Sequence, residues 1–73
     1  MTYKNGQMEI ESVGGNDVYR IFNRLSDDSY ILAWLPMFDH KNKTVEWAQG
    51  YYDMTIKEAS DLFNEKVRVL GEE

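Results

Sequence analysis

The sequence contains no cysteine, one proline and one histidine among its 73 residues. The absence of cysteine excludes disulfides and zinc–thiolate sites, so neither can hold the fold together. A chain of this length forms one domain and buries only roughly 60% of the surface that its unfolded form exposes. We therefore expect residues 1–73 to be a single small domain that is held by side-chain packing and needs no metal ion or cofactor.

Long apolar runs are missing as well. No stretch approaches the roughly 18 apolar residues of a membrane-spanning helix. Residues 1–6 are polar and lack the apolar segment of a secretory signal peptide. On these grounds we expect a cytoplasmic protein, with residues 1–6 and 71–73 loosely held at the ends of the domain.

Positive charge is scarce, since eight lysines and arginines stand against 13 aspartates and glutamates, for a net charge of −5. Proteins that bind nucleic-acid duplexes need cations that replace the counterions of the phosphates, and an anionic membrane surface attracts basic segments for a related reason. We therefore expect neither nucleic acid nor a membrane to be the partner. The partner is predicted to be a protein, either a different one or a second copy of this chain.

The clearest predicted element is a C-terminal helix over residues 56–70. Thr55 and Glu58 fit a capping box, in which two side chains satisfy each other's backbone N–H groups at a helix start. Apolar residues follow at spacings of three and four, the period of one helical face. These residues are Ile56, Ala59, Phe63, Val67 and Leu70.

The rest of the chain reads as two hairpins. Residues 30–38 and 44–52 are rich in β-formers and flank the polar turn 39–43, which predicts that Phe38 lies opposite Thr44. Residues 7–13 and 18–25 flank a turn through residues 14–17. With Gly15 and Asn16 as the two central residues of that turn, Ile10 is predicted to lie opposite Ile21. We predict an α+β fold, in which an antiparallel meander of about four strands carries one C-terminal helix on one face. A helix over residues 17–25 is the alternative, with the order β-α-β-β-α.

This pairing predicts a second sheet face that is apolar and that one helix cannot cover. Exposed apolar patches usually mark interfaces, so we expect a protein-binding surface there. A helix at residues 17–25, or strong curvature of the sheet, would cover the same face. The predicted binding residues are Phe22, Leu35, Trp47 and Tyr51 as anchors, with Arg20 and Arg24 as orienting charges.

No motif indicates catalysis. His40 lies in a predicted turn, the pair Asp27 and Asp28 has ordinary turn composition, and Gly14 with Gly15 lacks the pattern of a phosphate-binding loop. The function that the sequence favours is a non-enzymatic module that binds protein, including a second copy of itself. The alternative is a small acidic inhibitor of the phage type, which occupies the nucleic-acid-binding groove of a host enzyme. An enzyme is the third hypothesis.

Overall fold

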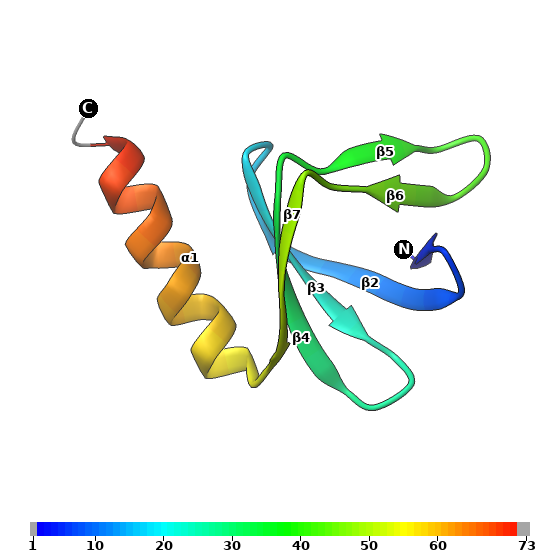
Figure 1. Cartoon of the computed structure of the whole chain (residues 1–73), viewed down its shortest axis with the longest axis horizontal. Coiled ribbons are helices and arrows are strands. Elements are labelled where there is room, and N and C mark those ends of the chain that lie inside the picture. Colours follow the sequence, from blue (N-terminus) through cyan, green and yellow to red (C-terminus); the bar gives the residue numbers. More distant parts are fainter. Residues whose placement is uncertain (1, 72–73) are drawn as a thin grey trace.

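The structure, a computed structural model, describes residues 2–71 and the side chains of residues 2–68. Within that range it contains seven strands and one C-terminal helix, α1 (Ile56–Gly71) (Figure 1). The strands are β1 (Thr2–Asn5), β2 (Met8–Gly15), β3 (Tyr19–Arg24), β4 (Ser29–Trp34), β5 (Met37–Asp39), β6 (Thr44–Glu46) and β7 (Gln49–Met54). They form one sheet in the order β5-β6-β1-β2-β3-β4-β7.

The predicted α+β class is confirmed, and the predicted number of strands is wrong. Two features add strands. Residues 2–5, expected to be loose, form β1, which pairs with β2 antiparallel and with β6 parallel. The predicted strands 30–38 and 44–52 are each interrupted, so that β5 and β6 form a hairpin of their own, which joins the sheet through β1. Met1 and residues 72–73 of the predicted loose ends lie outside the described residues.

The strand interpretation of residues 17–25 is confirmed, because β3 spans most of that segment. Its pairing differs from the prediction, since Ile10 lies opposite Arg24 and not opposite Ile21. The reason is the side chain of Asn16, whose Oδ1 accepts hydrogen bonds from the backbone N–H groups of Val18 and Tyr19, both at 2.8 Å. Asn16 therefore begins the turn, as this residue type favours, and the turn closes later than predicted.

The second predicted pairing is wrong by one residue. Phe38 pairs with Val45 instead of Thr44, and Leu32 pairs with Tyr51 instead of Gly50. Because side chains alternate along a strand, a shift of one residue moves a side chain to the other face. Tyr51 consequently lies on the helix side of the sheet.

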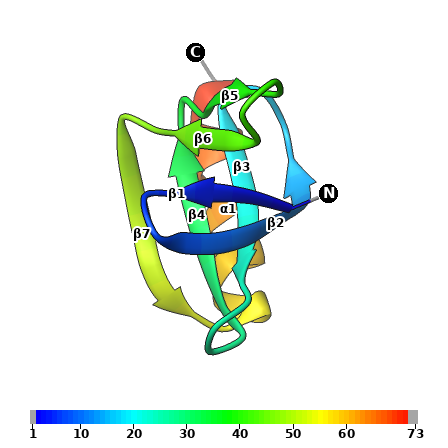
Figure 2. The ribbon, with the colours of Figure 1, turned by 90° about the vertical axis from the view of Figure 1, so that its right-hand side faces the viewer.

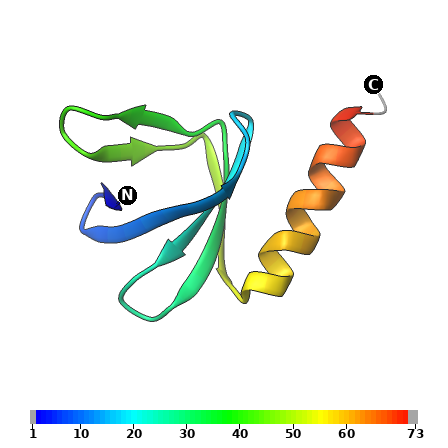
Figure 3. The same cartoon turned by 180° about the vertical axis from the view of Figure 1, so that it is seen from behind.

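The helix covers one face of the sheet, as predicted. Its first turn holds the capping box, with the Thr55 backbone N–H donating to Glu58 Oε1 (3.0 Å) and the Glu58 backbone N–H donating to Thr55 Oγ1 (3.1 Å). Ile21 and Leu32 of the sheet are buried together with Ala59 of α1. The view from behind in Figure 3 shows α1 beside this face of the sheet. Within the described residues no helix is long and apolar enough to cross a membrane.

The other face is buried by the sheet itself. Figure 2 shows β1, β5 and β6 lying across β3 and β4, on the side away from α1. The enclosed cluster consists of Tyr3, Ile10, Phe22, Ile31, Ala33 and Val45. Two irregularities in the pairing, between Ser12 and Gly14 in β2 and between Tyr30 and Leu32 in β4, accompany this curvature, since bulges bend a strand and increase its twist. The expected exposed apolar face is therefore absent from the described part of the chain, and curvature, one of the two alternatives, is what covers it.

Candidate functional site

Two of the predicted anchors belong to the enclosed core. Phe22 has no exposed surface, and its ring stacks on that of Trp47 with 5.5 Å between centroids and 28° between planes. Trp47 is half-buried, and its Nε1 donates a hydrogen bond of 2.9 Å to Tyr52 Oη. The predicted use of Phe22 as a surface anchor is corrected by its burial, and Trp47 serves first as a lid on the core.

Tyr51 is separated from those two residues by the sheet. It packs on the helix side, against the cluster formed by Ile21, Leu32 and Ala59. The Lys66 ammonium of α1 lies 5.4 Å from the centroid of the Tyr51 ring, a cation–π contact that closes the helix over β7. The predicted group of anchors is therefore divided between the two faces of the sheet.

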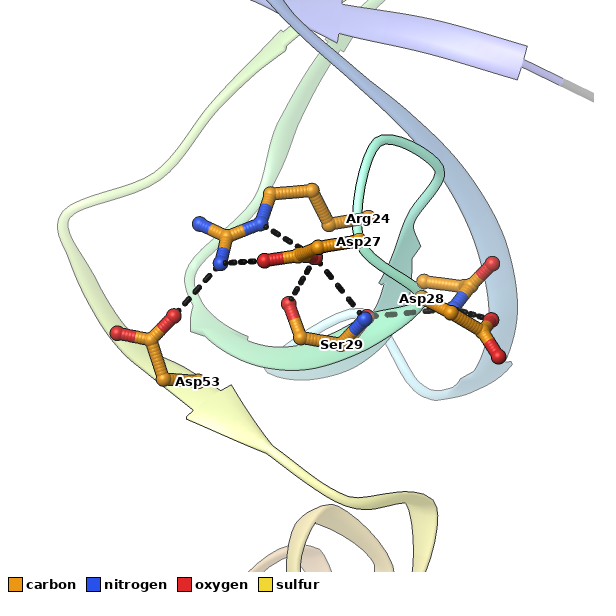
Figure 4. Close-up of polar contacts among 6 residues, drawn as sticks. Arg24, Asp27, Asp28, Ser29 and Asp53 are labelled. Carbon is orange, nitrogen blue, oxygen red and sulfur yellow. Dashed lines mark hydrogen bonds and ion pairs between the residues drawn. The ribbon is translucent and has the colours of Figure 1, made fainter.

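The two predicted arginines lie on the enclosed face at opposite ends of β3, with Phe22 between them. Arg24 is engaged through its Nε and Nη2 atoms. Its guanidinium forms ion pairs of 2.6 Å with Asp27 and with Asp53 (Figure 4). These contacts tie the β3–β4 loop to β7 and direct the Arg24 guanidinium toward two carboxylates of its own chain.

The same cluster perturbs the pKa values of its members. The hydrogen bond from Arg24 is the largest cause that lowers the pKa of Asp27 well below its usual value, and hydrogen bonds from the Ser29 hydroxyl and backbone N–H add to it. The pKa of Arg24 is raised in turn by its hydrogen bonds to Asp27 and Asp53. Because all of these groups are at the surface, solvent screens the pairs and their structural role is to fix the loop.

Arg20 is placed differently. Its guanidinium carbon lies 6.0 Å from the centroid of the Phe38 ring, and its Nε is buried without a hydrogen-bond partner within the described chain. It lines an open pocket of about 370 Å³, which we call the Arg20 pocket. The lining residues are Tyr3, Ser12, Asp17, Arg20, Phe38 and His40.

His40 has more contacts than a solvated turn residue needs. Its ring stacks on Phe38 at 5.6 Å with only 5° between the planes. Its Nδ1 lies 3.0 Å from the hydroxyl oxygen of Tyr3. The neighbouring Asp39 holds the turn, since hydrogen bonds from the side chain and backbone of Asn42 lower the pKa of the Asp39 carboxyl. His40 is therefore an exposed turn residue, as predicted, whose ring lies against Phe38 and Tyr3.

Leu35 is the predicted anchor that lies at the surface, and it has exposed neighbours. It belongs to the corner between β4 and β5, formed by residues 34–37, which we call the 34–37 corner. Trp34, Leu35 and Met37 are 36%, 42% and 62% exposed. Leu35 has a φ of 55°, in the left-handed region that costs a non-glycine residue roughly 1–3 kcal/mol.

Two hydrogen bonds of the Trp34–Leu35 peptide group hold the start of the corner in this conformation. The Leu35 backbone N–H donates to the Val18 carbonyl at 2.7 Å, and the Ala48 backbone N–H donates to the Trp34 carbonyl at 3.0 Å. A strained residue persists only where its surroundings determine it. The corner is therefore a rigid apolar projection and not a loose loop.

Trp34 and Met37 were missed as candidate residues. The sequence prediction placed them in one continuous strand, where Trp34 faces the helix. Pro36 was the available signal, because proline cannot donate to a ladder and so marks a strand end. A break at Pro36 would have placed its apolar neighbours on an exposed corner.

No group of three potential metal ligands occurs within the described residues. No protein-family model matches the chain, and no curated protein or solved structure matches it either. The 34–37 corner and the Arg20 pocket are therefore the two surface features from which a function can be inferred.

Proposed function

We propose that this protein is a non-enzymatic module that binds another protein through the 34–37 corner. The observation that carries the proposal is the joint exposure of Trp34, Leu35 and Met37 on a strained backbone corner, whose Trp34–Leu35 peptide group is hydrogen-bonded to Val18 on one side and to Ala48 on the other. Apolar side chains on a rigid backbone lose little conformational entropy on binding. A larger share of the free energy gained by burying them therefore contributes to the affinity.

The corner is the centre of such an interface and not its whole extent. A stable interface covers about 800 Å² on each partner, and a few central residues, often aromatic, supply most of the binding energy. Tryptophan, the residue type of Trp34, is among the residue types most enriched at such central positions. The surrounding contacts would come from the neighbouring ends of β3 and β7.

The free edges of the sheet support a side-chain interface over pairing by an added strand. Edge strand β5 has only three residues. Edge strand β7 is interrupted opposite the Tyr30–Leu32 segment, and its Asp53 has a φ of 59°. Short edges and bulges are features that prevent strand addition. The net charge of −5 also disfavours a second copy as the partner.

Leu35→Asn is the variant that tests the proposal without unfolding the chain. Asparagine tolerates a positive φ, so relief of roughly 1 kcal/mol of strain offsets the loss of about half of the burial energy of a leucine side chain. We expect a free energy of unfolding within about 1 kcal/mol of the wild-type value. Leu25→Asn is the matched control, because Leu25 is 43% exposed at the other end of β3.

The first measurement is crosslinking of partner proteins to a photoreactive residue at position 37 of each chain. The second is the solution mass of each purified chain, which reports whether it dimerises. A partner that crosslinks to the wild type and to Leu25→Asn, but not to Leu35→Asn, supports the proposal. Equal crosslinking of all three chains refutes it. Concentration-dependent dimerisation that Leu35→Asn abolishes would identify the partner as a second copy.

A further inference from the structure

We infer that the Arg20 pocket binds a single oxyanion group, a carboxylate or a phosphate, with Arg20 as its main ligand. This inference is independent of the function proposed for the 34–37 corner. Arg20 and Arg24 lie on the same face of β3, but their hydrogen-bond and ion-pair partners differ.

Arg24 is the reference for this comparison, because its charge is paired with carboxylates of the same chain. Two carboxylates contact its guanidinium at 2.6 Å. Arg20 makes no ion pair within the described chain, and its Nε lacks a hydrogen-bond partner. Buried polar groups are satisfied in the great majority of proteins, so an unsatisfied guanidinium N–H indicates a missing acceptor.

The surroundings of Arg20 leave room for that acceptor. The ring of Phe38 supports the guanidinium from one side. The Arg20 pocket, at about 370 Å³, is large enough for a small anion and its first waters.

The polar atoms of the pocket suit an oxyanion. Ser12 offers a hydroxyl group and His40 an imidazole, and both can donate a hydrogen bond. A guanidinium binds carboxylate and phosphate groups through two parallel N–H donors. Because Nε is enclosed, the anion would first contact the terminal nitrogens of the Arg20 guanidinium. A change of the Arg20 rotamer would then let Nε donate to the same anion.

One group in the pocket opposes an anion, which makes the inference testable in both directions. Asp17 lines the pocket and is exposed. Its negative charge would weaken the binding of an oxyanion at Arg20. Removing that charge should therefore tighten binding by roughly fivefold, the effect of one partly screened charge at short range.

The experiment is a titration of the full chain with inorganic phosphate and, separately, with acetate, followed by ¹H–¹⁵N NMR at constant ionic strength set with chloride. We expect saturable shifts at Ser12, Arg20 and His40, with an affinity on the order of millimolar. Arg20→Gln should abolish these shifts. The matched control Arg24→Gln should retain them, and Asp17→Asn should tighten the binding.

Each result has a defined meaning. Saturation by phosphate but not acetate identifies a phosphate-bearing ligand, and the reverse identifies a carboxylate. If neither anion saturates, or if the shifts persist in Arg20→Gln, Arg20 only packs on Phe38 and the inference is wrong. Should Arg20→Gln fail to fold, unchanged affinity in Asp17→Asn would overturn the inference by itself, because Asp17 is an exposed residue of the turn.

Discussion

Gly50→Ala should destabilise the protein although alanine suits a strand better than glycine. Gly50 lies in β7 beneath the hydrogen-bonded rings of Trp47 and Tyr52. A Cβ atom at this position would come within 2.6 Å of Trp47 Nε1, 2.6 Å of Tyr52 Oη and 2.7 Å of Tyr52 Cζ. Trp47 cannot easily withdraw, because its ring stacks on the fully buried Phe22.

The expected magnitude follows from two opposing terms. Overpacking of this kind costs about 1–3 kcal/mol, whereas replacing glycine by alanine within a strand gains about 0.5–1 kcal/mol. We expect a net loss of about 1–2 kcal/mol in the free energy of unfolding. For a domain of this size the melting temperature then falls by roughly 4–16 °C.

The assay is chemical and thermal denaturation, with the indole N–H resonance of Trp47 as a local probe. Gly14→Ala is the control, because no atom lies within 4 Å of its added Cβ. In a Tyr52→Ala background the cost of Gly50→Ala should fall by about 1 kcal/mol, since the neighbouring ring is gone. A Gly50→Ala protein that is as stable as Gly14→Ala, with an unmoved indole resonance, would refute this packing.

Three further predictions follow from local geometry. Gly15→Ala should cost more than Gly50→Ala in the same denaturation assay, because Gly15 has a φ of 108° and its added Cβ would meet the backbone carbonyl of Tyr19. Thr55→Ala should cost about 1 kcal/mol by removing the N-cap of α1, and Thr55→Ser should restore most of it. Asp27 has a lower pKa in the folded chain than its ordinary 3.8, so the unfolded chain binds more protons and the contribution of Asp27, complete above about pH 4, is lost as the pH falls below that value. Asp27→Asn should therefore flatten the acid side of the stability profile, and an unchanged profile would show that the contact with Arg24 does not persist in solution.

Local chemistry was readable from the sequence alone. The start of α1 depends on Thr55 and Glu58, which are three residues apart and satisfy each other without help from the rest of the chain. The apolar spacing after them depends only on the helical period. The strand character of residues 19–24 was likewise indicated by its residue types and by the turn before it.

Pairing and curvature were decided by the tertiary structure. The turn that begins at Asn16 is local, but it changes the partners of β3 in β2 along the whole strand. The bend of the sheet depends on bulges that no residue pattern marked. These features turned Phe22 inward and left Leu35 at an exposed corner.

The sequence by itself therefore determined the C-terminal helix and the strand character of residues 19–24, because helix caps and strand preferences act over a few neighbouring residues. It did not determine the number of strands, since β1 forms only through its pairing with β2 and β6. The tertiary structure alone decided which side chains meet, since Arg20 and His40 are twenty positions apart and come to one pocket only when β5 folds across β3. The residues that we propose for binding belong to that second class, and their positions depend on the curvature of the whole sheet.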